Sequence, residues 1–396
     1  MISERLLNKL SRETSTGRFI PQLDGMRFVA ISMVVLFHVN GYVASHSPAV
    51  FAAPPEQDGL YRLLMHGHYG VQFFFIISGF ILALPFASHY LHDTPRIDLS
   101  AYYLRRLTRL EPPYLLSLIL ICGLIVLLKG EELRTLFPHL AAGFGYVHNI
   151  AYGTGNRLNG VAWSLEVEVQ FYLLVPLLTK LFAIPHRLRR RLAIIALGLL
   201  AIILQRVFIQ GPGGAFGLSI LNFLQFFLVG FLLADLYLCE WRDDPTRHWA
   251  WDVFAVIGCC TLPYVWSNGI LISFAFPALA FLLYYAVFRG VVAYKVFGNR
   301  WLVTIGGMCY SIYLLHYPII NFAFGRSRSL VLTHNFEINL LAQFLIIAPA
   351  VLAISAIFFV LIEKPCMRKD WPARLWAKAR VMLRPPTLRQ PVKASE

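Results

Sequence analysis

The sequence predicts an all-α integral membrane protein: a polytopic helical bundle of about ten transmembrane helices with both termini in the cytoplasm. Hydrophobic residues make up 58% of the 396 residues and charged residues 14%, and the mean hydropathy is +0.62. A water-soluble fold cannot bury that much apolar surface. The basic residues, which give a net charge of +14, fall between apolar stretches rather than on one domain face. This distribution favours membrane topology over nucleic-acid binding.

Apolar stretches of about 20 residues, each long enough to cross a bilayer, recur along the chain. The ten predicted spans lie near 24–43, 69–88, 110–128, 163–184, 192–209, 217–237, 249–265, 269–288, 303–324 and 340–362. A tight turn, "WSNG", separates the seventh from the eighth. With the N-terminus inside, 27 of the 35 Lys and Arg residues fall on the cytoplasmic side and seven outside. This asymmetry agrees with the positive-inside rule and supports ten spans.

Two outer connections are long. Residues 44–68 contain a polar, proline-rich loop, "SPAVFAAPPEQDG". Residues 129–162 are aromatic and interrupted by Gly and Pro, so we expect them to dip into the membrane or to cover a cavity. We expect the basic tail from Lys364 to lie on anionic head groups.

Three further features limit the class of protein. Many apolar stretches follow the first one, so we expect no cleaved signal peptide. The six cysteines show neither CxxC nor Cys/His metal-ligand spacing, so we expect neither a disulfide framework nor a metal site. No nucleophile elbow or P-loop is found, which argues against a covalent serine hydrolase.

The first span contains a stripe of polar residues. Arg27 and His38 are eleven residues apart, and eleven helical steps of about 100° return to within about 20° of the start. The two side chains therefore share one helix face, about 16 Å apart along the axis, and Asp24 lies one turn before Arg27. Ionisable residues inside a membrane usually mark function. The alternatives are that Arg27 extends to the interface and that His38 bridges two helices in the core.

The fourth span begins with two acids. Ser164, Glu168 and Tyr172 share one face, whereas Glu166 points to the opposite side. Hydration of either acid near the outer surface is the alternative to a functional role. Pro176 predicts a kink.

Three arginines occur in "RRLTRLEPPY", residues 105–114. They are either a topology anchor or a docking site for a phosphate-bearing cytosolic ligand.

In the ninth span, Tyr310, Tyr313 and Tyr317 form a stripe close to His316. Core packing is the alternative to a functional role for this stripe. In the second span, the Gly after Ser78 predicts a close helix contact.

Six short motifs occur in order between residues 23 and 365. They are "LDGMRFVAISMVVLFH", "FFFIISGFIL", "RRLTRLEPPY", "WSLEVEVQFYLLVP", "YSIYLLHYP" and "EKP". This series resembles the motifs of acyltransferase family 3, membrane proteins that O-acylate sugars and other small acceptors. One departure is Val169, where members often have a second acid after the residue equivalent to Glu168.

The resemblance implies roles for individual residues. It makes His38 and Glu168 catalytic, and it assigns donor binding to Arg27, Arg106 and Arg109. The residues expected to support them are Asp24, Ser78, Trp163, Ser164, Tyr172, Tyr313, His316 and Glu363. The chain would then consist of a cytoplasmic N-terminal segment (1–22), a transmembrane acyltransferase domain (23–363) and a basic cytoplasmic tail (364–396).

The resemblance also implies an activity. The protein would move an acyl group, with acetyl favoured, from cytoplasmic acyl-CoA to a hydroxyl of an envelope or exported glycan or of a lipid-linked sugar. A periplasmic glucan and a secondary metabolite are further acceptor classes. Neutral His38 would take the hydroxyl proton and return it to the thiolate, without an acyl-enzyme.

The remaining expectations concern partners and location. We expect no bound cofactor, no metal and no nucleic acid. We expect contact with membrane lipids and a location in the bacterial inner membrane. Some family members have an additional esterase-like domain. Because only 33 residues follow Glu363, we expect any such envelope-biosynthesis partner to be a separate chain.

Two other function classes stay open at the sequence level. A proton-coupled transporter or exporter of a small charged solute would also contain buried Arg, His and Glu residues. No inverted repeat or pair of broken helices is evident to support it. A catalytically inactive scaffold in an envelope-polymer machine is the third class. An acyltransferase would incorporate an acyl group into a product, whereas a transporter would move a solute without chemical change.

Overall fold

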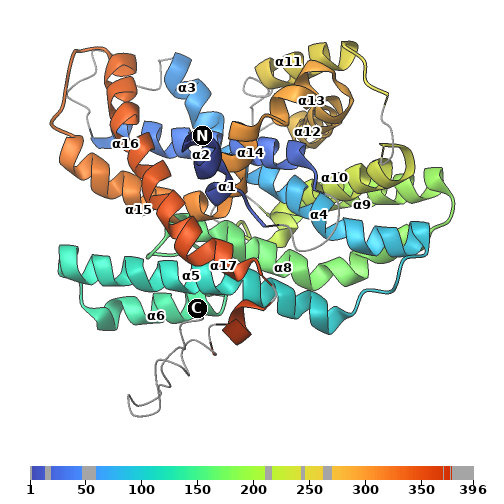
Figure 1. The fold of residues 1–396 in the computed structure, drawn as a ribbon, viewed down its shortest axis with the longest axis horizontal. Helices are drawn as coiled ribbons and strands as arrows, with labels where there is room; N and C mark the ends of the chain where they lie inside the picture. Colours follow the sequence, from blue (N-terminus) through green and yellow to red (C-terminus); the bar gives the residue numbers. More distant parts are fainter. Residues whose placement is uncertain are drawn as a thin grey trace, which may run out of the picture.

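The computed structural model describes residues 2–13, 19–46, 59–209, 216–241, 246–261, 270–368, 370–374 and 376. Every regular element in this part of the chain is helical, which confirms the all-α class (Figure 1). Eight of its helical segments are long and apolar enough to cross a membrane, and a bent pair is a ninth candidate. The predicted "WSNG" turn and residues 47–58 of the first outer loop lie outside the described residues.

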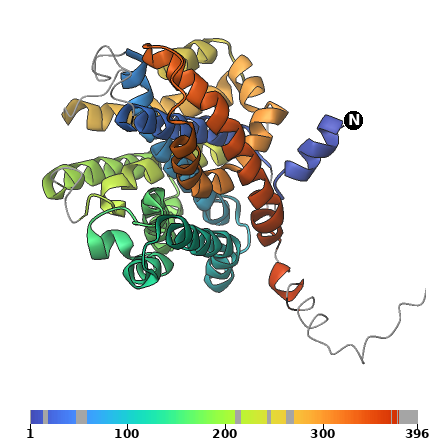
Figure 2. The same ribbon diagram turned by 90° about the vertical axis from the view of Figure 1, so that its left-hand side faces the viewer.

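The long helices provide the framework of the bundle. They are α2 (Pro21–His46), α4 (Gly70–His92), α5 (Leu99–Lys129), α8 (Trp163–Leu178), α9 (Arg187–Phe208), α10 (Ile220–Leu236), α12 (Ile270–Arg289), α15 (Cys309–Ser327) and α16 (Phe336–Phe358). The shorter α-helices are α1 (Ile2–Leu10), α3 (Gly59–Met65), α6 (Leu133–Phe144), α7 (His148–Tyr152), α11 (Ala250–Thr261), α13 (Val292–Phe297), α14 (Arg300–Gly307) and α17 (Lys364–Cys366). The 3-10 and π turns are η3 (His66–Tyr69), η4 (Gly160–Ala162), η5 (Thr179–Ala183), η6 (Tyr237–Trp241) and η7 (Phe359–Glu363). Figure 2 shows α1 at the periphery, close to the end of the last long helix.

Nine of the ten predicted spans coincide with these candidates. The seventh, 249–265, falls on α11, which has 12 residues and is shorter than a usual span. Residues 262–269, which follow it, are outside the described chain.

The ninth predicted span, 303–324, coincides with a bent pair of helices. Two helices, α14 and α15, meet there at an angle of 67°. Gly306 and Gly307 precede the break, and glycine lowers helix stability. A Cβ on Gly306 would lie 1.8 Å from the carbonyl oxygen of Asp24, so α14 packs directly on the backbone of α2. The bend brings Gly307 and Cys309 to the polar cavity described below.

Helix α5 begins well before the predicted third span. Asp98 caps it by accepting a hydrogen bond from the backbone N–H of Ser100 (3.0 Å), a standard N-cap. The motif "RRLTRLEPPY" is therefore entirely helical. Arg106 and Arg109 are three residues apart, so they lie on the same side of α5.

The predicted close contact after Ser78 is confirmed. A Cβ on Gly79 would lie 2.2 Å from the carbonyl oxygen of Phe227, and a Cβ on Gly230 would lie 2.3 Å from that of Ile76. Only glycine allows the backbones of α4 and α10 to approach this closely. The contact fixes α4, and with it Ser78, beside the cavity.

Candidate active site

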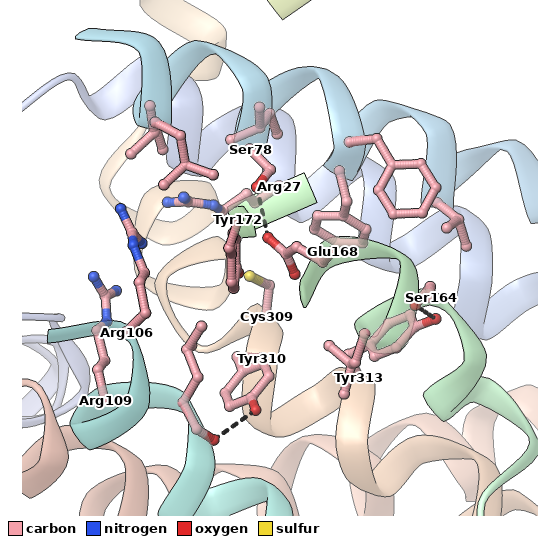
Figure 3. A pocket seen from close by; sticks show the side chains of 18 of the residues that line it. Arg27, Ser78, Arg106, Arg109, Ser164, Glu168, Tyr172, Cys309, Tyr310 and Tyr313 are labelled. Atoms are coloured by element: carbon pink, nitrogen blue, oxygen red, sulfur yellow. Dashed lines mark hydrogen bonds between the residues drawn. The ribbon is translucent and has the colours of Figure 1, made fainter. Parts of the chain in front are cut away.

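A polar cavity of about 150 Å³ lies between α2, α4, α5, α8 and the α14–α15 bend. Its polar and thiol-bearing lining residues are Arg12, Arg27, Ser78, Arg106, Arg109, Ser164, Glu168, Tyr172, Cys309, Tyr310, Tyr313 and Glu363. Figure 3 shows Arg27, Arg106 and Arg109 on one side, with Glu168 near the centre and the Ser164–Tyr313 pair on the other side. The cavity therefore has a basic end and a hydroxyl-rich end.

At the basic end, one carboxylate serves two arginines. Asp24 is 1% exposed, and its Oδ1 accepts hydrogen bonds from Arg27, one turn along α2, and from Arg12 at 3.1 Å. The shared carboxylate orients both guanidinium groups but balances only one positive charge. The other charge is available for an anion.

Helix α5 adds two more cations. The Arg106 guanidinium lies 5.8 Å from the ring centre of Tyr102 and 5.6 Å from that of Tyr172, within cation–π range. Among the described residues, neither Arg106 nor Arg109 has a carboxylate within 4.0 Å. Arginine matches phosphate geometry by bidentate hydrogen bonding, so this end suits a phosphate-bearing ligand.

Towards the centre, Glu168 is fixed by a serine. Ser78 Oγ donates to Glu168 Oε1 at 2.6 Å (Figure 3). Ser164 Oγ and Tyr313 Oη lie 2.6 Å apart, and Tyr313 also donates to the carbonyl of Val161 at 2.9 Å. The predicted shared face of Ser164, Glu168 and Tyr172 is confirmed, since all three line the cavity.

Glu166 faces away from the cavity. It is fully buried, and its Oε2 accepts the backbone N–H of Asn149 at 2.7 Å. It thereby holds α7 against α8. Segment 129–162, expected to be an outer connection that dips into the membrane or covers a cavity, contains the short helices α6 and α7. Its Asn159 amide donates to the carbonyl of Leu314 at 2.9 Å.

Glu363 is another acid that lines the cavity. It accepts hydrogen bonds from the backbone N–H (3.0 Å) and the hydroxyl of Ser311. It belongs to the π turn η7 and lines the cavity near Cys309.

His38 and His316 are in contact beside the cavity. Nδ1 of His38 lies 2.9 Å from the carbonyl oxygen of Val34 and 3.2 Å from Nε2 of His316. Nδ1 of His316 lies 2.8 Å from the carbonyl of Tyr313. Neither histidine lines the cavity. Tyr313 does, and its ring centre lies 5.7 Å from that of His316, so Tyr313 and His316 connect the cavity wall to His38 by side-chain contacts.

These contacts determine the tautomers of the neutral rings. A carbonyl only accepts, so Nδ1 of His316 must be protonated and its Nε2 must accept. Nδ1 of His38 faces a carbonyl and that accepting nitrogen, so it carries the proton. Nε2 of His38 is left with a lone pair, as a general base requires.

A sequence model for the acyltransferase domain matches residues 20–360 of this chain. The chain belongs to acyltransferase family 3. Relatives of the family include O-acetyltransferase OatA from Staphylococcus aureus strains NCTC 8325, COL and MRSA252. Each is 28% identical over 337 aligned residues, which cover 77% of this chain and 51% of the relative. The chain thus spans about half the length of these curated relatives. No solved structure matches it.

In this acyltransferase family member, most predicted site residues meet at one place. Those lining the cavity are Arg27, Arg106, Arg109, Ser78, Ser164, Glu168, Tyr172, Tyr313 and Glu363, while Asp24 contacts Arg27 and His316 contacts His38. Trp163 does not line it: its ring lies 5.2 Å from Phe223 and helps to seat α8.

Arg12 and Cys309 also line the cavity, although neither was predicted from the sequence to be a site residue. Arg12 lies upstream of the matched region and was counted among the topology cations. Cys309 follows the unexpected bend. No local sequence pattern distinguishes either of them.

Proposed function

We propose that this protein transfers an acyl group, with acetyl favoured, from cytoplasmic acyl-CoA to a hydroxyl of an envelope or exported glycan or of a lipid-linked sugar. The observation that carries the proposal is a cavity with a cluster of arginines at one end and a path to a base-competent histidine at the other. The match to the acyltransferase domain supports acyl transfer, and the name O-acetyltransferase of the relatives supports acetyl as the group.

The arginine cluster is the donor end. Arg27, Arg106 and Arg109 would bind the phosphates of CoA, because guanidinium groups pair bidentately with phosphate oxygens. His38 lies three helical turns along α2 from Arg27, about 16 Å by helix geometry. An extended pantetheine arm can bridge such a separation and present the thioester near His38.

The reaction needs one base and no covalent intermediate with the protein. His38 Nε2 removes the proton from the acceptor hydroxyl as its oxygen attacks the thioester carbonyl carbon. The new C–O bond forms and the C–S bond breaks. The sulfur leaves as a thiolate and receives the proton from His38. The products are an ester and free CoA.

Glu168 is placed to bind rather than to deprotonate. Its carboxylate is held by Ser78 in the middle of the cavity and does not contact His38 through any hydrogen bond described above. We infer that it orients the acceptor hydroxyl or the thioester-bearing arm.

We also propose the arrangement of the chain in the membrane. The acyltransferase domain covers residues 23–363, and the N-terminal segment 1–22 and the basic tail 364–396 are cytoplasmic. The distribution of Lys and Arg supports this orientation. It places the arginine end of the cavity on the cytoplasmic side, where acyl-CoA is found.

Inverted membrane vesicles test the function directly. Vesicles from cells with and without the protein receive acetyl-labelled acetyl-CoA on the cytoplasmic face. We expect label in the glycan or lipid-linked sugar fraction, with matching release of CoA thiol, only when the protein is present. Solute movement without label incorporation would instead support the transporter class. Absence of both signals in vesicles that contain host glycans would refute the acetyl-CoA donor.

Replacement of His316 tests the path to His38. His316→Leu removes one of the two acceptors that face Nδ1 of His38 and leaves the Val34 carbonyl at 2.9 Å. The loss of one hydrogen bond costs about 0.5–1.5 kcal/mol, so we expect kcat to fall about 2- to 10-fold. His316→Gln offers an amide oxygen as acceptor and should retain more activity. The KM for acetyl-CoA should stay unchanged in both variants, because the arginines are untouched.

The matched control is His89→Leu. His89 contacts the carbonyl of Thr94 (2.6 Å) and does not line the cavity. Equal activity of His316→Leu and His316→Gln, or a change confined to KM, would contradict a positioning role for His316.

A further inference from the structure

The N-terminal segment reaches into the polar cavity. Arg12 precedes the first span and lies outside the matched region 20–360. Its side chain is only 17% exposed, and it lines the cavity together with Arg27, Arg106 and Arg109. The basic end is therefore completed by a residue from outside the family motifs.

The Arg12 side chain is held in place at several points. Its Nη1 donates to Asp24 Oδ1 at 3.1 Å. A Cβ on Gly307 would lie 3.6 Å from Cβ and Cγ of Arg12, so the aliphatic stem packs on a glycine surface. Its Nε is buried and has no hydrogen-bond partner among the described residues. The contacts within the described part of the fold therefore leave one N–H group of this guanidinium unsatisfied.

Two basic residues near the end of the membrane domain hold the segment that bears Arg12. Arg368 donates to both carboxylate oxygens of Glu13, at 2.8 and 2.7 Å, a bidentate pair. Lys364 Nζ donates to the carbonyl of Lys9 at 2.7 Å, at the C-terminal end of α1, where a cation is favourable. The Arg368 hydrogen bonds lower the pKa of Glu13, so the pair is charged at neutral pH.

A purely structural role accounts poorly for Arg12. Its guanidinium shares Asp24 with Arg27, and the two acids that line the cavity are Glu168 and Glu363. Among the described residues, these three carboxylates face the four arginines of the cavity, so one positive charge lacks a counter-charge there. Burial, reinforced by the charge of Arg27, lowers the pKa of Arg12. Placing a second buried cation there costs free energy that a fold alone does not recover, whereas an anionic ligand would offset it.

We propose that Arg12 is a fourth donor-binding residue that binds a phosphate of the acyl-CoA donor. Glu13, Lys364 and Arg368 act as positioning residues that hold Arg12 in the cavity. This inference rests on the proposed function, because it takes the donor to be acyl-CoA. It assigns the N-terminal segment a part in substrate binding.

The test compares Arg12→Gln with Arg300→Gln in purified, detergent-solubilised protein. Arg300 pairs with Glu4 of α1 at 3.5 Å, is 55% exposed and does not line the cavity, so it is the matched control. We expect Arg12→Gln to weaken CoA binding and raise the KM for acetyl-CoA by about tenfold to 100-fold, the usual effect of losing a charged hydrogen bond. The change in kcat should be smaller, and Arg300→Gln should behave as wild type.

The possible results of this test distinguish a failure of the role of Arg12 from a failure of the proposed function. No CoA binding by the wild type would refute the donor, and with it the proposed function. Wild-type binding that Arg12→Gln retains in full would overturn the role of Arg12 and leave the function standing. If Arg12→Gln fails to fold, the variant Arg368→Gln tests the role of Arg12 instead. It loosens the segment without touching the cavity, so a folded variant with an unchanged KM would overturn the inference.

Discussion

His38→Ala is expected to lower the rate of acyl transfer by about 10²- to 10⁴-fold, the usual contribution of a general base. The loss should fall on kcat, because Nε2 of His38 acts when the hydroxyl attacks. CoA binding should be retained, because His38 does not line the cavity that the arginine cluster lines. Initial rates of label transfer and CoA release, together with equilibrium CoA binding, measure the two effects separately.

Two control measurements distinguish loss of the catalytic base from loss of the fold. His89→Ala removes a histidine of α4 that does not line the cavity, and its activity should match the wild type. Added imidazole should partly restore His38→Ala, because a small base can occupy the vacated space and take the proton. Wild-type turnover by a folded His38→Ala variant would exclude His38 as the base.

Helical periodicity predicted much of the cavity lining from the sequence. The 3.6-residue period placed Asp24 beside Arg27, and it placed Ser164, Glu168 and Tyr172 on one face. It also separated Glu166 from Glu168, and the structure gives them different partners, Asn149 and Ser78. Such relations lie within one helix, where local geometry is sufficient.

Contacts between helices could not be predicted in this way. His38 and His316 are 278 residues apart, and no periodicity within either helix specifies the other. The break after Gly307 depends on the approach of α14 to the backbone at Asp24, a tertiary contact. The position of Arg12 depends in turn on that break, because its stem packs on Gly307.

The same limit applies to Arg190 and Asp235. From the sequence, Arg190 was interpreted as one of the cytoplasmic cations that set topology, and Asp235 in the sixth span was assigned no role. In the structure Arg190 is 1% exposed and pairs with the fully buried Asp235, which joins α9 to α10. An acid inside an apolar span, with a run of arginines just before the predicted fifth span, was the available signal.

Asp235→Ala is expected to destabilise the protein by about 3–5 kcal/mol, because it leaves Arg190 buried without its counter-charge. Arg190→Met should cost less, since Arg191 Nε also donates to Asp235 (2.8 Å) and would still neutralise it. In the double variant Arg190→Met/Asp235→Leu, no buried charge lacks a partner at this site, so stability should recover towards the wild type.

Unfolding midpoints in one detergent, measured for all four proteins, give the comparison. The polar cavity does not include either residue, so CoA binding by the folded fraction should be unchanged. A double variant less stable than Asp235→Ala would show that the pair contributes net stability beyond charge compensation, contrary to this expectation.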